Sequence, residues 1–505
     1  MNAASSTVRR TLFNVLFASV GYVGIRLIVA PVRIKILTSV LSKETYGALT
    51  LVMLTVSFVT LISSLGSLEY MIRKLPGRPR SFQLSVLRTI MTYFGLLAGA
   101  IGVIGVLGLA AWQPEKLGLT AMDYVAAGLI LVLTVHLVQL VYFLMGRSEY
   151  AQSRLLMLFY GDAWFLPLLI FMWWIEITIH FMLWLWVVWL ILSVVFSQVY
   201  VQTRALLRVR PSRVQLKEIV VFGVPLLPMI MGEWIFQMQD RYVLLAFTDL
   251  EAVANFTLCY NIAWIGVFTG AALVDVLVTE FYKMRNRVDS TDLAVLVAHQ
   301  PLRQSFSMLL RYALLVCIPI FGALWFGYTP IVLLLSDPQF SDAAPLLRWV
   351  APIPVLYSLM NISARTLIAT DRGRVVGIGT LGAAAVHLVL SLLLVPQMAE
   401  RGVALAGCIA YGLLAIYLGY RVRFGQWIDW ATVRPLRLIL FAGITLATFH
   451  FSFNSLPVPG FLALVIGGLI SLASLFIVGL MPMADLRHLI ESIQYSAAED
   501  ESAAD

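Results

Sequence analysis

Long apolar segments recur along almost the whole chain, and they limit its possible folds more than any other feature. A helix crossing the roughly 30 Å hydrocarbon layer of a membrane needs about 20 apolar residues, and segments of that kind follow one another between residues 12 and 481. Hydrophobic residues make up 60% of the 505 residues and charged residues only 12%. There are too few polar side chains to cover a soluble globule of this size, so we expect an all-α, polytopic membrane protein.

Fourteen of these segments are candidate transmembrane helices. They cover residues 12–39, 46–68, 86–111, 121–145, 154–174, 178–201, 219–246, 252–280, 307–334, 345–369, 374–396, 402–421, 435–453 and 459–481. We expect two pseudo-symmetric six-helix lobes and an additional helix pair. The predicted ranges are 1–210 for the first lobe, 211–425 for the second and 426–483 for the pair, with an acidic cytoplasmic tail over 484–505.

The positions of the basic residues predict the orientation in the membrane. Cytoplasmic loops of membrane proteins are enriched in Lys and Arg. With the amino terminus placed inside, 26 of the 35 Lys and Arg fall in or beside cytoplasmic segments, four lie outside and five lie within spans. This bias predicts a multi-pass protein of the cytoplasmic (inner) membrane with both termini in the cytoplasm. The chain has a net charge of +8, and we expect it to contact membrane lipids rather than nucleic acid.

The first apolar segment carries three cations, Arg26, Arg33 and Lys35. A charge at the bilayer centre costs about 2.5–3.5 kcal/mol on insertion scales, so such residues are candidates for function. Arg26 and Arg33 are seven residues apart and therefore share one helical face. Pro31 lies between them and should bend the helix. Three cations without an acid favour an anionic ligand at this segment.

The seventh segment carries Glu233, Gln237, Asp240 and Arg241, whose spacing places all four on one helical face. Two prolines, Pro225 and Pro228, should break its cytoplasmic half. The first and seventh segments are thus both charged and interrupted by proline, and each would open a six-helix lobe. Corresponding broken helices in two halves indicate the binding site of a transporter.

Two interpretations of these charges remain open. In one, Arg26 pairs with Glu233 and Arg33 with Asp240, and the pairs only neutralise each other. In the other, which we favour, the charges line a water-filled cavity. Asp162 and Asp275 are candidates for binding a coupling ion, Na⁺ or H⁺. We expect no other cofactor and no metal site, because the three cysteines lie within apolar runs and no His has a suitably spaced partner. The chain also lacks the common catalytic motifs and a large extramembrane segment, so we expect a transporter rather than an enzyme.

Three segments together resemble the polysaccharide flippases of the multidrug/oligosaccharidyl-lipid/polysaccharide (MOP) exporter superfamily. The first has a short loop, acidic-x-x-Gly, a Leu-Gly turn and a basic end. The second has a Pro-rich entry and the Asp-Arg pair. The third has a hydrophobic-Pro exit followed by Gly-x-x-Ala-Gly. They cover residues 33–74, 222–256 and 367–414.

This resemblance implies a flippase that moves an undecaprenyl-diphosphate-linked oligosaccharide across the cytoplasmic membrane for surface polysaccharide synthesis. Arg26, Arg33 and Arg241 would bind the diphosphate, because Arg offers bidentate geometry to phosphate. The remaining polar residues of the seventh segment, Glu233, Gln237 and Asp240, would bind sugar hydroxyls or a coupling cation. A polysaccharide polymerase and other glycan-assembly proteins would be the protein partners.

Four other functions remain open. A multidrug extruder of the same superfamily would need an acidic cavity for organic cations, which the cationic first segment disfavours. A lipid II flippase is a second alternative. A glycan polymerase or ligase is disfavoured by the short outer loops. A scaffold for a glycan-assembly complex is the last.

Overall fold

Helices form all the regular secondary structure in the part of the chain that the computed structural model describes. These residues are 21, 24–112, 118–197, 209–285, 288, 293–454 and 458–480. Ten of the helices are long and apolar enough to cross a membrane, and an eleventh span results if one bent helix pair is counted as a single span. The expected all-α, polytopic membrane architecture is confirmed. The predicted acidic tail, 484–505, lies outside the described residues.

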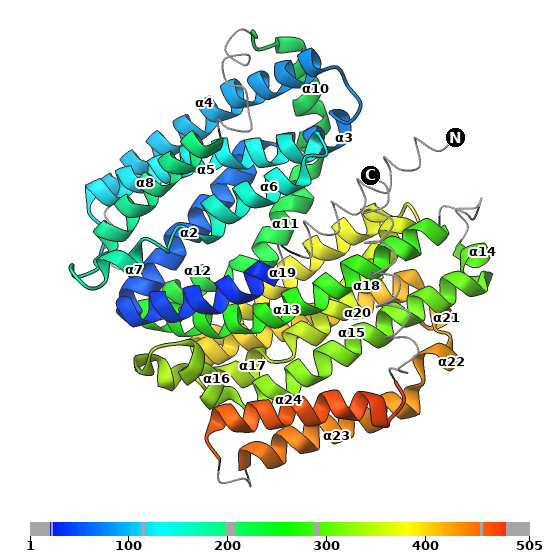
Figure 1. Ribbon diagram of the computed structural model, residues 1–505. Coiled ribbons are helices and arrows are strands. Elements are labelled where there is room, and N and C mark those ends of the chain that lie inside the picture. Colours follow the sequence, from blue (N-terminus) through cyan, green and yellow to red (C-terminus); the bar gives the residue numbers. More distant parts are fainter. Residues whose placement is uncertain are drawn as a thin grey trace, which may run out of the picture.

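The first half of the chain forms one lobe, which we call the first lobe (Figure 1). Within it, α4 and α8 pack on α5, and α5 packs on α2 and α3. Its elements are α2 (Lys43–Ser64), α3 (Ser67–Lys74), α4 (Arg80–Trp112), α5 (Ala121–Gly146), α6 (Tyr150–Met157), η2 (Leu158–Asp162), α7 (Leu168–Phe171), α8 (Ile179–Ser197) and α10 (Arg213–Gly223).

The second lobe lies beside the first and is built around α13, which packs on α15 and α18, and α20, which packs on α18 and α19 (Figure 1). Its elements are α11 (Leu227–Met238), α12 (Asp240–Phe247), α13 (Leu250–Arg285), α14 (Leu293–Ala298), α15 (Gln300–Phe326), α16 (Tyr328–Leu335), η4 (Pro338–Ala343), α17 (Leu346–Val350), α18 (Ile353–Ala369), α19 (Gly373–Met398), α20 (Glu400–Val422), α21 (Phe424–Trp427) and α22 (Trp430–Val433).

The last two helices, α23 (Pro435–Asn454) and α24 (Gly460–Ile477), pack on each other and on α15 at the edge of the second lobe (Figure 1). Large apolar side chains on their outer faces are strongly exposed, as at Leu436 and Ile477, which are both 82% exposed. Continuous exposed apolar faces of this size fit contact with lipid rather than with water.

The structure interrupts some predicted spans and leaves another continuous. The helix that contains Pro31 runs unbroken over residues 24–40, contrary to the predicted interruption at this proline. Most of the rest of that predicted span lies outside the described residues. The predicted span 154–174 is divided into α6, the π-helix η2 and the short α7, and the span 345–369 is divided into α17 and α18 before Pro352. The count of fourteen spans therefore stays a prediction.

The seventh segment breaks where the prolines predict. The 3₁₀ turn η3 (Val224–Leu226) contains Pro225 and ends the stretch Arg213–Leu226, whose axis differs by 48° from that of Ile230–Met238. A proline removes a backbone donor and clashes with the preceding turn, which explains the bend. On one side of the break α10 packs on α3 and α4 of the first lobe, and on the other side α11 packs on α19 of the second. The chain passes between the lobes at η3.

Candidate functional site

A carboxylate and two guanidinium groups meet where the helix over residues 24–40 crosses the first lobe. Asp162 Oδ2 lies 3.3 Å from Arg26 Nε, and its Oδ1 lies 3.6 Å from Arg33 Nη1. The Asp162 side chain is 7% exposed, whereas the arginine side chains are 27% and 23% exposed. We call these three residues the arginine cluster. Its two cations lie on one helical face, as the sequence predicts, and both retain access to solvent or a ligand.

The π-helix η2 places Asp162 in this cluster. A π-turn inserts an extra residue into a helix and re-aims the side chains that follow, and such turns are frequent at functional sites. Here the Ala163 amide donates to the Leu158 carbonyl over 2.9 Å, and the Trp189 Nε1–H of α8 donates to the Phe159 carbonyl over 2.7 Å. The Phe159 ring also stacks on Trp189. The backbone that carries Asp162 is therefore fixed to α8.

Arg26 also connects the two lobes. Its guanidinium carbon lies 4.7 Å from the centre of the Phe268 ring on α13, a cation–π contact. In the described residues the ion pairs seen for these arginines are with Asp162, whereas the neutralising pairs considered from the sequence were Arg26 with Glu233 and Arg33 with Asp240. Asp162 and the two arginines are each evident as candidates in the sequence. Their contact depends on η2, which has no clear sequence signal.

The four polar residues of the seventh segment fall into two environments. Glu233 on α11 is exposed, and its Oε1 accepts a weak hydrogen bond from Gln237 Nε2 at 3.4 Å. Asp240 and Arg241 on α12 are each 2% exposed. The predicted common face exists, but α13, α19 and α20 cover its α12 end. The contacts that the described residues show for Asp240 and Arg241 lie within the second lobe.

Asp240 forms a buried pair with His387 of α19. His387 Nε2 lies 2.9 Å from Asp240 Oδ1, and His387 Nδ1 lies 2.9 Å from the Phe236 carbonyl oxygen. A carbonyl oxygen only accepts, so Nδ1 carries a hydrogen. The Nε2–Oδ1 contact is close but is not aligned as a hydrogen bond. Asp240 and His387 therefore form a close polar pair between α12 and α19.

Arg241 is enclosed by backbone and aromatic rings. Its Nη1 donates to the Gln237 carbonyl over 3.0 Å, and its guanidinium lies 4.2 Å from the Tyr260 ring centre and 5.0 Å from that of Phe256. The contact with the neighbouring Asp240 carboxylate is longer, at 3.7 Å. In this conformation Arg241 is a buried component of the second lobe. The remaining ion-binding candidate, Asp275, lies on α13, and its side chain lies outside the described part of the structure.

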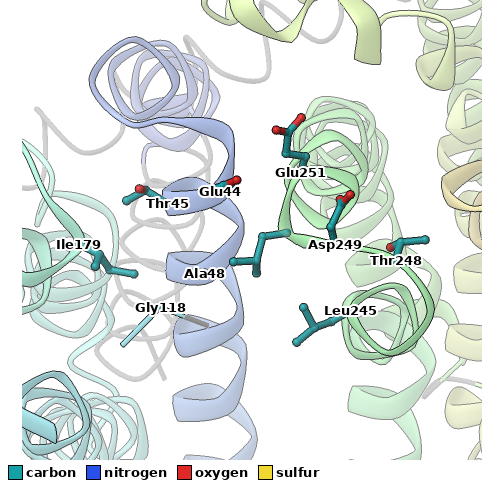
Figure 2. Close-up of a pocket in the computed structure, with 10 residues that line it drawn as sticks. Glu44, Thr45, Ala48, Gly118, Ile179, Leu245, Thr248, Asp249 and Glu251 are labelled. Atoms are coloured by element: carbon teal, nitrogen blue, oxygen red, sulfur yellow. The ribbon is translucent and has the colours of Figure 1, made fainter. Parts of the chain in front are cut away.

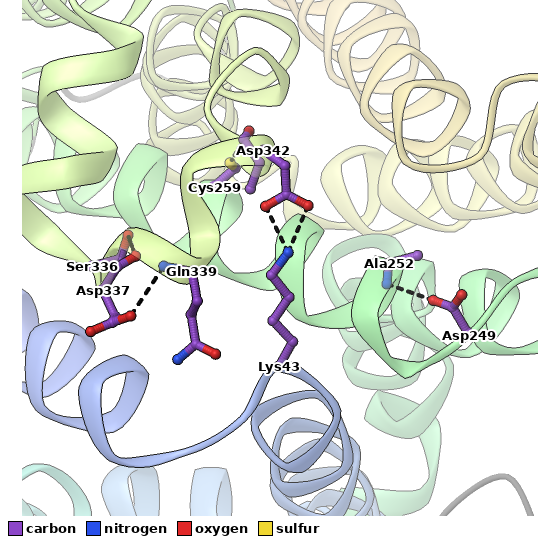
Figure 3. A network of polar contacts seen from close by, with 9 residues as sticks. Lys43, Asp249, Ala252, Cys259, Ser336, Asp337, Gln339 and Asp342 are labelled. Atoms are coloured by element: carbon purple, nitrogen blue, oxygen red, sulfur yellow. Dashed lines mark hydrogen bonds and ion pairs between the residues drawn. The ribbon is translucent and has the colours of Figure 1, made fainter.

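Polar contacts join the two lobes at the end of the molecule that contains η4, which we call the η4 end (Figure 3). Lys43 Nζ lies 2.6 and 2.7 Å from the carboxylate oxygens of Asp342. Gln339 Nε2 donates to the carbonyls of Thr38 and Leu41 over 2.7 and 3.0 Å. Lys35, the third cation of the first segment, donates to the Ser336 carbonyl over 2.5 Å. These contacts close the junction between the lobes at this end.

A pocket of about 470 Å³ lies near these contacts, where α2 approaches the start of α13 (Figure 2). Three carboxylates line it, those of Glu44, Asp249 and Glu251. Asp249 accepts a hydrogen bond from the Ala252 amide at the beginning of α13. The carboxylates make this pocket unfavourable for an anion, so the arginine cluster is the better candidate for an anionic ligand.

Elements of the first lobe touch closely at the opposite end, which contains α3 and α10 and which we call the α3 end. A Cβ added at Gly223 would overlap the Leu65 carbonyl oxygen, and Gly66 faces Gly223 at the same contact. Gly66 has a positive φ of 71°, a conformation that glycine adopts without strain. Two glycines thus allow the end of α2 and the end of α10 to meet backbone to backbone.

No protein-family model and no curated protein sequence matches the chain. Solved structures do match its fold. The lipid II flippase MurJ in an inward closed conformation gives a TM-score of 0.69 at 14% identity, covering 91% of this chain and 98% of that one. The chain has the fold of the MOP-superfamily transporters.

Two further structures show how widely this MOP fold is shared. An inward-facing multidrug resistance MATE family transporter gives a TM-score of 0.60 at 14% identity, over 81% of this chain and 98% of that one. A MOP superfamily transporter from Pyrococcus furiosus gives 0.53 at 14% identity, over 83% and 95%. At these identities the similarity establishes the fold and leaves the substrate open.

Proposed function

We propose that the protein is a flippase that moves an undecaprenyl-diphosphate-linked oligosaccharide across the cytoplasmic membrane. The observation that carries this proposal is the arginine cluster, in which Arg26 and Arg33 lie on one helical face and are about one quarter exposed. A guanidinium offers two parallel donors to a phosphate, and two such groups match the charge of a diphosphate. MurJ, which shares the fold, is a lipid II flippase.

The proposed movement is a rocking of the two lobes about the junction that contains Arg26. Because α10 packs with the first lobe and α11 with the second, the bend at η3 absorbs their relative rotation. The α3 end carries a basic segment with Arg73, Lys74, Arg78 and Arg80, which under the positive-inside rule supports a cytoplasmic location for this end. The η4 end, closed in this structure, then faces outward.

An ion gradient is the proposed energy source, with Na⁺ or H⁺ as the coupling ion. Asp275 remains a candidate for binding this ion on the sequence alone. At Asp162 the ion would have to displace Arg26 and Arg33 from the carboxylate. A polysaccharide polymerase and other glycan-assembly proteins are proposed as partners that would use the flipped product.

The first test combines a deletion strain with complementation. We expect one undecaprenyl-diphosphate glycan to accumulate in lipid extracts measured by mass spectrometry, together with loss of its surface polymer. Wild-type protein should reverse both effects, whereas Arg26→Ala should not, although it reaches the membrane in normal amount. Arg348→Ala is the matched control, since it removes an arginine that stacks on Tyr328 away from the arginine cluster. Full complementation by Arg26→Ala would overturn the proposed site.

A multidrug extruder is the second candidate, favoured by the exposed Glu233 on α11 and by the MATE structures that share the fold. The same deletion strain distinguishes the two. An unchanged pool of lipid-linked glycans together with increased sensitivity to cationic drugs would support the extruder. Accumulation of lipid II in place of another glycan would identify a lipid II flippase.

A further inference from the structure

Asp162 lies within ion-pair distance of both Arg26 and Arg33. Both contacts are loose. The distances of 3.3 and 3.6 Å exceed the roughly 2.7–2.9 Å of a strong charge-assisted hydrogen bond between nitrogen and oxygen. The carboxylate is therefore near enough to neutralise one positive charge, but it does not hold either guanidinium in an optimal geometry.

The three groups differ in how firmly they are held. Asp162 is 7% exposed and lies on η2, whose backbone is fixed to α8 through Trp189. The arginines are about one quarter exposed and extend on long side chains from the helix over residues 24–40. An incoming anion can thus draw the guanidinium groups toward itself while the carboxylate stays in place.

We propose that Asp162 is an internal counter-ion that competes with the substrate's diphosphate, or with a similar phosphate group, for Arg26 and Arg33. This inference rests on the proposed function. Without a ligand the arginine cluster has a net charge of +1, which limits the cost of two cations in a membrane protein. When the diphosphate binds, the arginines turn to it, and when it leaves they return to Asp162.

This competition adjusts affinity to the needs of transport. A carrier must bind its ligand well enough to load it and weakly enough to release it on the other side. Two arginines without a counter-ion would hold a diphosphate too firmly, and a fixed carboxylate beside them lowers the affinity and favours release. Neutralising Asp162 should therefore tighten binding and slow transport.

The test uses the full-length protein in lipid nanodiscs with farnesyl diphosphate as the probe and farnesol as the uncharged reference. We expect Asp162→Asn to bind farnesyl diphosphate about tenfold more tightly than wild type and to leave farnesol binding unchanged. Asp162→Ser is measured alongside, so that the result does not depend on the folding of one variant. Asp371→Asn, at an exposed turn between α18 and α19, is the control for the same change in net charge.

A purely structural role for Asp162 makes a different prediction. Asp162→Asn and Asp162→Ser would then lower the melting temperature and leave the affinity for farnesyl diphosphate equal to or weaker than that of wild type. That result would overturn the counter-ion role and leave the proposed function standing, provided that wild-type binding still depends on Arg26. If neither wild type nor the Asp162 variants bind farnesyl diphosphate, both the counter-ion role and the proposed diphosphate site are wrong.

Discussion

Three arginines of similar sequence context have different surroundings in the structure. Arg26, Arg33 and Arg241 all lie in apolar segments and all read as candidate ligands for a diphosphate. Arg26 and Arg33 remain partly exposed beside Asp162, whereas Arg241 is 2% exposed and covered by the rings of Tyr260 and Phe256. A sequence shows which side chains are costly to bury, and only the packing of other helices shows which of them are buried.

Breaking the pair of Asp240 and His387 should destabilise the second lobe. Asp240→Asn removes a carboxylate that is 2% exposed and leaves Arg241 without that counter-charge. Removing one partner of a buried pair costs about 3–5 kcal/mol, so we expect a clear loss in thermal stability of the purified protein. Asp342→Asn should have little effect, because its side chain is 57% exposed and exposed ion pairs contribute about 0–1 kcal/mol.

A double variant decides whether the effect arises from the pair itself. Asp240→Asn combined with His387→Gln changes both members of the pair, so the combined loss should be smaller than the sum of the single losses. Strict additivity would show that Asp240 and His387 are not energetically coupled. The sequence identifies His387 as a histidine inside a span. Its partner, 147 positions away, is visible only when α12 and α19 pack together.

At the scale of the elements, the interruptions of helices position the candidate site. The break at η3 was predictable, since Pro225 and Pro228 dictate it. The π-helix η2 was not, because the segment Leu158–Asp162 contains only one glycine and no proline. Its geometry depends on tertiary contacts with Trp189 and other rings of α8, and residues far apart in the chain supply these contacts.

Trp189→Phe should loosen η2 without removing a charge. The variant keeps an aromatic ring for stacking on Phe159 but loses the 2.7 Å hydrogen bond to its carbonyl. A hydrogen bond of this kind contributes about 1 kcal/mol, so we expect modest destabilisation. We also expect a two- to threefold tighter binding of farnesyl diphosphate, because Asp162 is less firmly placed. Trp184→Phe, on the exposed side of α8, should change neither quantity.

The contact between α2 and α10 depends on the absence of side chains at two glycines. In Gly223→Ala the new methyl group would overlap the Leu65 carbonyl, so the end of α10, which leads into the break at η3, must move away from the end of α2. We expect faster labelling of a cysteine introduced on α3 and at least a fivefold loss of transport. Gly95→Ala on α4 is the control, because a Cβ there meets no atom within 4 Å. Equal labelling rates in the two variants would contradict a role for this contact.

At the scale of the whole molecule, the sequence predicts the class of fold well and the arrangement of the lobes only in outline. Apolar length alone predicts fourteen spans, and the described residues contain ten helices that can span a membrane and the bent pair. The contacts at the η4 end, by contrast, could not be predicted from the sequence. Lys35, Thr38 and Lys43 are ordinary polar residues near the end of a span, and their partners Ser336, Gln339 and Asp342 lie about 300 positions later. No local pattern connects the two sets.

The η4 end should open more readily when its ion pair is reversed. Lys43→Glu places a second carboxylate beside Asp342, replacing an attraction with a repulsion between the lobes. An exposed pair contributes up to about 1 kcal/mol, which corresponds to about a fivefold change in the population of the open state. A membrane-impermeant maleimide can report that population through Thr248→Cys, which lies in the pocket at this end. Background labelling should be low, since Cys259 and Cys317 are buried and Cys408 is partly buried.

We therefore expect Lys43→Glu to increase the rate of labelling at position 248 about fivefold, and the added substitution Asp342→Lys to restore it, because the exchanged pair again attracts. Lys74→Glu makes the same change of charge at the α3 end and should leave labelling at position 248 unchanged or slow it. If Lys43→Glu and Lys74→Glu accelerate labelling equally, net charge rather than the ion pair sets the rate. The contacts of the η4 end would then not control the balance between the two sides of the membrane.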